Sequence, residues 1–234
     1  MNDSGEINEY GFQIKENEEW FEVHSGAVTN TNPGSMVYVT IDTTPICDNM
    51  SDQEFRKTVL MLRDDAVNAI KVRIQELSDW NAGEQERVKK WFGKSDENTR
   101  TKLKSGLAAV VAVMNGLAAR NFVRVDSWRD KATGCVPGMK NLDGEVAHVC
   151  APDAATRTIA INRNFCYLPG KSESKLSSMQ LTIVHECTHF VDTFGSVDYP
   201  GGYGYTACTW LARDHPEHTI TNADSIAWYV LARY

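Results

Sequence analysis

One short run, His185-Glu186-Cys187-Thr188-His189, limits what this chain can fold into more than any other feature. Residues four positions apart lie on one face of a helix, so the imidazoles of His185 and His189 can reach the same metal ion. Glu186 is turned by about 100° from His185, which lets its carboxylate approach a water on that ion without being a ligand. We therefore expect residues 172–194 to form a helix that carries the core of a zinc hydrolase.

Two faces are predicted on this helix. The apolar face comprises Ile183, Cys187, Phe190 and Phe194. The polar face comprises His185, His189 and Asp192. A helix that is buried on one side and presents two histidines on the other suits a metal site. Gly195 follows the last periodic residue and is expected to end the helix, while Cys187 is expected to be a buried thiol or a disulfide partner, not a ligand.

The length of 234 residues predicts one catalytic domain, at 47–234, preceded by an extension at 1–46 that acts as a leader, pro-segment or delivery segment. A formal net charge of −7 argues against nucleic acid as a partner. No apolar run approaches the length of a membrane span. The first residues are polar and acidic, so no signal peptide is visible.

Six cysteines indicate secretion although no signal peptide is visible, because an even number of cysteines is typical of a disulfide-bonded, secreted chain. They are Cys47, Cys135, Cys150, Cys166, Cys187 and Cys208. The absence of a CxxC pair argues against a structural zinc ribbon or a thioredoxin-like site. We expect a protein that is secreted or delivered outside the producing cell, by a route without a visible signal peptide or after trimming.

The remaining elements predict an α+β, helix-rich fold with a small β-sheet beside the HExxH helix. The capping box Ser51-x-x-Glu54 opens a helix that runs to about Ser78. Further helices are expected at Glu84–Phe92, from Ser95 through Leu117, at Thr206–Arg213 and at Asn222–Ala232. Strands are expected at Trp20–His24, Met36–Ile41, Phe122–Val125, Glu145–Val149 and Thr158–Ile161.

The third metal ligand is not fixed by the HExxH run. A HExxHxxGxxH extension is absent, because Asp192 and Gly195 stand where its glycine and histidine would be. Glu217 is the only glutamate downstream, and it lies in a charged turn between His215 and His218. Asp198 is better placed, because Gly195 lets the chain reverse after the helix and return an acid toward the metal.

Three ordered motifs resemble those of the aspzincins, the deuterolysin and peptidyl-Lys metalloendopeptidase family. Gly195-Ser196-Val197-Asp198 followed by Tyr203-Gly204 resembles their GTxDxxYG motif, and Asn222-Ala223-Asp224 resembles their NAD motif. The resemblance implies a zincin-like domain with one Zn²⁺ held by His185, His189 and Asp198. It also implies Glu186 as general base and Tyr203 as hydrogen-bond donor to the oxyanion. Four residues separate Asp198 from Tyr203, where the family has two, so Tyr199 is a rival for that role.

The same resemblance carries expectations for specificity and for the cysteines. In Lys-specific members, the NAD aspartate and a glutamate three residues later form an acidic S1′ pocket. Here Asp224 either lines that pocket or holds a ligand histidine, and Ala227 replaces the glutamate. We therefore expect a weak basic preference at P1′, or acceptance of uncharged residues. The family's disulfide implies Cys150 with Cys166, which leaves Cys47 with Cys135 and Cys187 with Cys208.

These features predict a zinc-dependent endopeptidase that hydrolyses peptide bonds with a metal-activated water. The substrate is a protein or peptide, whose backbone would pair with the strand region Arg157–Asn162. A cognate inhibitor or secretion machinery is a further expected partner. Three alternatives stand beside this reading: a gluzincin-type peptidase using Glu217, a non-catalytic zinc-binding interaction domain, and a delivered toxin with this peptidase core.

Overall fold

The computed structural model describes residues 43–135, 144–172 and 174–232. The chain divides after Pro45, and the unit that begins at Ile46 contains all the elements named below. The strands predicted at Trp20–His24 and Met36–Ile41 lie outside the described residues, as does most of the predicted extension. Within the described part, every helix is too short or too polar to cross a membrane.

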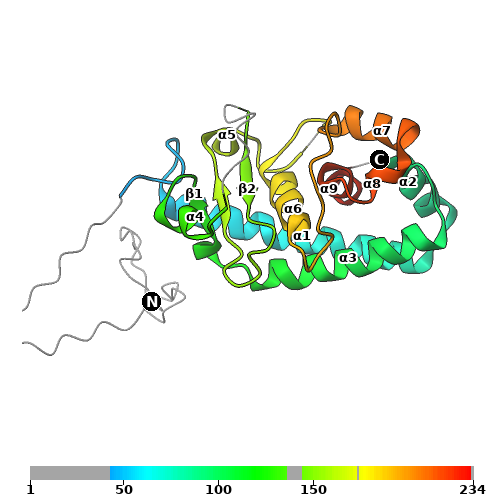
Figure 1. The fold of residues 1–234 in the computed structure, drawn as a ribbon, viewed down its shortest axis with the longest axis horizontal. Helices are drawn as coiled ribbons and strands as arrows, with labels where there is room; N and C mark the ends of the chain where they lie inside the picture. The colour runs from blue at the N-terminus through cyan, green and yellow to red at the C-terminus, as the bar shows by residue number, and fades with distance from the viewer. Residues whose placement is uncertain (1–42, 136–143, 173, 233–234) are drawn as a thin grey trace, which may run out of the picture. The chain divides into compact units, whose positions relative to one another are not determined.

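Three helices form the first half of this unit: α1 (Asp52–Asp79), α2 (Ala82–Phe92) and α3 (Glu97–Gly116). The predicted capping box is confirmed, because the Ser51 hydroxyl accepts from the Glu54 N–H while the Glu54 carboxylate accepts from the Ser51 N–H. α1 and α3 pack along each other and lie beneath α6 in Figure 1. The buried faces of α1 and α3 pack against α6, the helix that carries His185 and His189.

A three-stranded sheet lies beside the metal helix, as expected. Its strands β1 (Phe122–Arg124), β2 (Ala147–Val149) and β3 (Ile159–Ile161) all fall within predicted segments. The order is β1-β3-β2, with β1 parallel and β2 antiparallel to β3. Because β3 is paired on both sides, the prediction that Arg157–Asn162 binds the substrate backbone is wrong. The edge strand that lies against α6 is β2 (Figure 1).

The two faces of the sheet have different neighbours. Ile159 and Ile161 point into the main core, together with Phe122 and Ala147. His148 lies on the opposite face, where its Nε2 is 2.9 Å from Asp130 Oδ1 of α4 (Trp128–Ala132). Two short elements, η1 (Ala119–Asn121) and α5 (Arg163–Cys166), connect the sheet to the helices.

The metal helix, α6, is shorter than predicted and spans Met179–His189. Ser178 caps its start, because its hydroxyl accepts from the Leu181 N–H. The helix ends at His189, not at Gly195. The single proton of the Thr193 hydroxyl can be donated, one at a time, to three carbonyl oxygens at the end of the helix, two of which also accept backbone N–H groups. The three oxygens belong to Cys187, Thr188 and Phe190.

The C-terminal helices enclose α6 on the side away from the sheet. They are α7 (Tyr205–Asp214), the short α8 (Pro216–Thr219), which was not predicted, and α9 (Ala223–Leu231). α9 packs directly against α6 (Figure 1). Every residue of α6 from Met179 to Thr188 is consequently buried. The prediction of one buried and one open face is therefore wrong, and Asp192 lies beyond the helix, paired with Arg157.

The disulfides differ from all three predicted pairs. Cys47 is bonded to Cys166, and Cys135 is bonded to Cys150. Cys187 and Cys208 are free and buried. Both belong to the hydrophobic core, and the Cys208 thiol also donates to the Gly202 carbonyl at 3.1 Å.

We expect the Cys47–Cys166 bond to contribute more to the free energy of unfolding than the Cys135–Cys150 bond. The bonds span 119 and 15 residues, and closing the longer loop removes more entropy from the unfolded chain. In the chain-entropy model these lengths correspond to about 5 and about 3 kcal/mol. Urea unfolding of the two double Cys→Ser variants measures the difference. A larger loss from the Cys135–Cys150 pair would contradict this ranking.

Candidate active site

Two histidines of α6 and one aspartate of the following loop meet at a single point. The Nε2 atoms of His185 and His189 are 3.1 Å apart. Asp198 Oδ1 lies 3.1 Å from the first and 3.4 Å from the second. Among the described residues these three form the one group of histidine, cysteine and acidic side chains whose donor atoms converge closely enough for a metal ion.

The hydrogen bonds made by the Nδ1 atoms of the two histidines show which ring nitrogens carry a proton and which face the meeting point without one. His185 Nδ1 lies 2.7 Å from Asp224 Oδ1, and His189 Nδ1 lies 2.8 Å from the Ser196 carbonyl. A carboxylate and a carbonyl can only accept, so both Nδ1 atoms carry the proton. When both imidazoles are neutral, their Nε2 atoms therefore turn lone pairs toward each other and toward the Asp198 carboxylate.

This arrangement fits a zinc ion. Three lone-pair donors facing one another repel unless a cation lies between them. Zinc binds imidazole nitrogen at about 2.0–2.1 Å in a tetrahedral arrangement, which places its ligand atoms about 3.4 Å apart. The observed separations of 3.1–3.4 Å agree with that value. Two imidazoles and one carboxylate also form a donor set that suits zinc.

The pKa values follow from the same contacts. Burial alone would lower the pKa of His185, but hydrogen bonds to Asp198 and Asp224 outweigh it and raise that pKa. Burial would raise the pKa of Asp198, yet the two histidines hold it well below its usual range. Asp198 is therefore a carboxylate, and the raised pKa of His185 means that a metal ion at this point has to compete with a proton for its Nε2.

Asn222 fixes the loop that brings Asp198 to the histidines. Its Oδ1 accepts from the Tyr199 N–H at 3.2 Å, and its Nδ2 donates to the Gly202 carbonyl at 2.9 Å. The backbone of Val197 pairs with the residues on either side of Asn222. Asn222 is 1% exposed, so these bonds are shielded from water. The NAD motif includes Asn222, but no role for it can be predicted from the sequence, because its side chain acts on a loop 20 residues away.

Asp224 acts on the histidine and on the loop together. Its Oδ1 accepts from His185, and its Oδ2 accepts from the Gly204 N–H. Of the two expectations for Asp224, this geometry fits the one in which it holds a ligand histidine. Ala227, one turn further along α9, is fully buried. Both carboxylate oxygens of Asp224 are thus engaged within the protein, and Ala227 has no carboxylate to offer a substrate.

Glu186 and Tyr203 lie beside the convergent group without being part of it. Burial raises the pKa of Glu186, against the opposing effect of the two histidines. The Tyr203 ring stacks on His185 with centroids 5.8 Å apart. Burial and the charges of Asp198 and Glu186 raise the pKa of Tyr203, so its hydroxyl keeps its proton. Tyr199, its rival, instead stacks on His218 at 4.3 Å.

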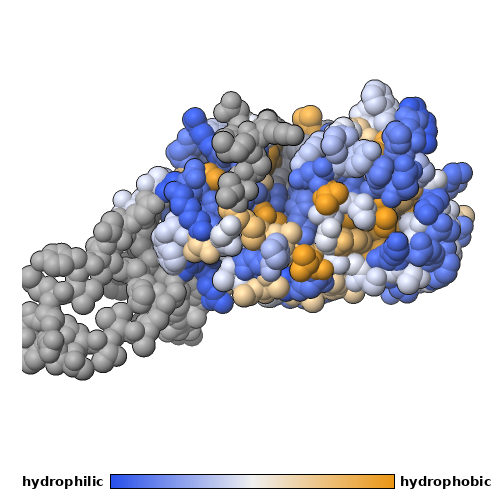
Figure 2. All heavy atoms as spheres, in the orientation of Figure 1, coloured by the Kyte–Doolittle hydropathy of each residue, from blue (hydrophilic) through white to orange (hydrophobic). Residues whose placement is uncertain are grey.

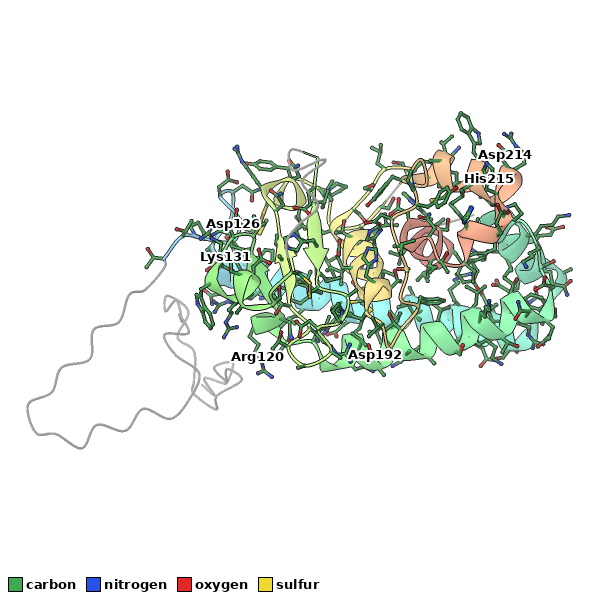
Figure 3. The ribbon with its side chains drawn as sticks, viewed as in Figure 1. Arg120, Asp126, Lys131, Asp192, Asp214 and His215 are labelled. Atoms are coloured by element: carbon green, nitrogen blue, oxygen red, sulfur yellow. A yellow bond between two sulfur atoms is a disulfide. The ribbon has the colours of Figure 1, made fainter. Side chains whose placement is uncertain are left out.

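Glu217 does not reach the convergent group. Its carboxylate lies 3.5 Å from His215 and 3.4 Å from His218, in a cluster that is largely open to solvent. Figure 3 labels His215 beside Asp214, at the end of α7 that points away from α6. Glu217 is therefore not in position to complete the ligand set that a gluzincin would require.

The helix-borne histidines, the returning aspartate and the adjacent sheet define a metallopeptidase fold. The aspzincin family, described as lysine-specific metallo-endopeptidases, matches residues 78–231. A zinc peptidase from Grifola frondosa superposes with a TM-score of 0.57 at 19% sequence identity, over 76% of this chain and 94% of that chain. No curated protein matches. The chain belongs to the aspzincin family, and it is a metalloendopeptidase with the predicted helix-rich α+β fold.

We expect Asp224→Asn to weaken zinc binding by about 10–100-fold, because partners that orient a ligand histidine have effects of this size. Asparagine keeps the shape of the side chain but removes its charge and one of its two acceptor oxygens. Competition with a chelator of known affinity measures the change. Asp214→Asn, at an exposed aspartate on α7, is the matched control. Equal affinity in the two variants would show that Asp224 does not support His185.

Proposed function

We propose that the protein is a zinc-dependent endopeptidase with one zinc ion held by His185, His189 and Asp198. The observation that carries this proposal is the meeting of their three donor atoms at 3.1–3.4 Å, with both histidine Nδ1 protons engaged elsewhere. Bound zinc supplies a Lewis acid that polarises the scissile carbonyl and lowers the pKa of water. The other contributions come from side chains of the chain.

Glu186 is proposed as the general base. It follows a ligand histidine directly and lies 3% exposed beside both ligand imidazoles. A carboxylate whose pKa is raised by burial is a stronger base than one in water. Glu186 would take a proton from the attacking water and then deliver it to the leaving amine. Proton transfer of this kind contributes about 10²–10⁴-fold to the rate.

Tyr203 is proposed as the donor that stabilises the oxyanion. Its ring lies against His185, and its hydroxyl keeps the proton that it must donate. A preorganised donor of this kind is worth about 3 kcal/mol of transition-state binding. The stacking of the rival Tyr199 on His218, at 4.3 Å, supports the choice of Tyr203 for this role.

The substrate backbone is proposed to pair with the edge strand β2. The Asn162 N–H donates to the Val146 carbonyl at 3.0 Å, so Val146 and Asn162 form a hydrogen-bonded pair of the antiparallel ladder. Such pairs recur at every second residue, so His148 and Ala160 form the next one. Ala147 and Val149 therefore direct their N–H and C=O groups to the edge away from β3. An extended peptide that adds a strand there would lie against α6.

The two disulfides suit an oxidising compartment. We therefore propose that the protein acts outside the producing cell on a protein or peptide substrate. A cognate inhibitor and secretion machinery remain proposed partners. Because Asp224 is engaged and Ala227 is buried, we do not extend the family's description as lysine-specific to this chain.

A metal analysis paired with a digest tests this function. We expect about one zinc per chain, and cleavage of unfolded casein at internal bonds that stops with a chelator and returns with zinc. Zinc bound at that ratio without any cleavage would favour the non-catalytic interaction domain. Cleavage that persists in the fully metal-free protein would contradict the zinc mechanism.

A further inference from the structure

Two hydroxyl groups, those of Thr188 and Ser196, join the His189 ring to the backbone of His185. The Thr188 Oγ1 lies 2.7 Å from the His185 carbonyl oxygen and 2.7 Å from the Ser196 Oγ. The Ser196 Oγ lies in turn 3.3 Å from His189 Nδ1. The Ser196 N–H also donates to the Thr188 carbonyl at 3.1 Å, so the backbone holds the two hydroxyls side by side.

Both hydroxyls are shielded from water. Thr188 and Ser196 are buried, whereas polar side chains cover much of the face seen in Figure 2, where water can satisfy them. A buried hydroxyl without a partner destabilises the fold. The two hydroxyls therefore depend on each other and on the two histidines for their hydrogen bonds.

These groups have one consistent order of donors and acceptors. The His185 carbonyl can only accept, so Thr188 uses its single proton there. Thr188 then accepts from Ser196, whose own single proton is used in that bond. The Ser196 Oγ is left as an acceptor toward His189 Nδ1. A neutral His189 ring that carries its proton on Nδ1 satisfies this acceptor, together with the Ser196 carbonyl at 2.8 Å.

We propose that Thr188 and Ser196 are positioning residues that fix the neutral imidazole of His189 in the tautomer that leaves Nε2 free for a metal ion. Thr188 occupies one of the two positions that the HExxH pattern leaves open. The proposal rests on the metal group of the proposed function, because a free Nε2 has its use as a ligand. It gives His189 a side-chain support comparable to the one that Asp224 gives to His185.

Removing the Thr188 hydroxyl alone should weaken zinc binding more than removing both hydroxyls. In Thr188→Val the Ser196 proton loses its acceptor. The group that remains within hydrogen-bond distance of it is His189 Nδ1, which accepts only when the ring proton has moved to Nε2. A protonated Nε2 cannot bind zinc, so this competition weakens the site. Thr188→Val/Ser196→Ala has no unpaired hydroxyl proton, and the competition disappears.

Competition with a chelator of known affinity, on the intact protein, measures zinc binding without any cleavage. We expect Thr188→Val to weaken binding by about 10-fold, the lower end of the effects of partners that orient ligand histidines. Thr188→Val/Ser196→Ala should bind within about threefold of the wild-type protein, since it loses only neutral hydrogen bonds. Thr188→Ser keeps the hydroxyl and should bind zinc as the wild-type protein does.

Thr182→Val is the matched control. Thr182 lies on the same helix, is also buried, and donates its hydroxyl to the Ser178 carbonyl at 3.1 Å. Its replacement should leave zinc affinity unchanged. A double variant that binds zinc no better than Thr188→Val would make both hydroxyls ordinary structural groups and overturn the proposal. A loss in Thr182→Val equal to that in Thr188→Val would do the same.

Nuclear magnetic resonance of the metal-free wild-type protein tests the tautomer without any variant. In isotope-labelled protein, couplings between ring nitrogens and carbon-bound protons show which nitrogen of His189 carries the proton. At alkaline pH, where the imidazole is neutral, we expect the proton on Nδ1. A proton on Nε2 would overturn the proposal even where the protein binds zinc and cleaves peptides. The expected tautomer and affinities in a protein that binds zinc but cleaves nothing would instead sink the peptidase function and leave the positioning role standing.

Discussion

Replacing Glu186 with glutamine is expected to lower kcat by about 10²–10⁴-fold while the protein still binds one zinc ion. Glutamine has nearly the same shape as glutamate but cannot take a proton from water. The ligand atoms belong to other residues, so the metal group keeps its geometry. Steady-state cleavage of a peptide substrate and zinc analysis of the same preparation measure the two quantities.

A matched control separates this effect from a general change of charge. Glu217→Gln removes one negative charge at an exposed glutamate and is expected to leave both kcat and zinc content unchanged. Loss of zinc from Glu186→Gln would make Glu186 a ligand or a structural residue, and the proposed mechanism would then fail. Normal turnover would exclude Glu186 as the base.

The HExxH spacing was enough to predict that the two imidazoles meet. Helix geometry alone places His185 and His189 on one face, and their Nε2 atoms do meet at 3.1 Å. The same geometry could not predict the length of the helix. At its end the carbonyls of Thr188 and Phe190 accept from backbone N–H groups of the following loop and lie within reach of the Thr193 hydroxyl, contacts that no periodic pattern reveals. The apolar residues beyond His189 look like another helical turn but lie in the following loop.

Contacts between distant segments account for the other differences. The three strands were predicted in sequence, but the position of β3 in the centre of the sheet depends on which strands pair. Six cysteines allow fifteen pairings, and the sequence contains no information that selects Cys47 with Cys166. Asn222 and Asp224 act through loop backbone groups at Gly202 and Gly204, so their roles appear only in the folded chain.

The loop after α6 carries Asp198, the proposed third ligand, and the fold of this loop does not depend on the Asp198 side chain. Asp198 is 43% exposed at its side chain, so truncating it leaves no buried cavity. The loop backbone is held by independent bonds: the Val197 N–H donates to Thr221, and the Tyr199 N–H donates to Asn222. Asp198→Ala should therefore fold normally and lose only its contact with the two histidines.

We expect Asp198→Ala to weaken zinc binding by more than about 100-fold, because changes to outer partners alone cost 10–100-fold and this change removes a ligand. Titration with a series of chelators measures the affinity, and Glu217→Ala serves as the comparison. Glu217 lies in the exposed cluster with His215 and His218, so its removal should not change zinc retention. The reverse ranking would assign the third ligand to Glu217, as in a gluzincin.

Thermal or urea unfolding gives a second readout that does not depend on activity. A ligand at 100 times its dissociation constant stabilises the folded state by about 2.7 kcal/mol. Zinc at such a concentration should raise the free energy of unfolding of the wild-type protein and of Glu217→Ala by this amount. A 100-fold weaker site at the same concentration is only half occupied and gains about 0.4 kcal/mol, so Asp198→Ala should respond little. An equal response in all three proteins would show that Asp198 does not hold the ion.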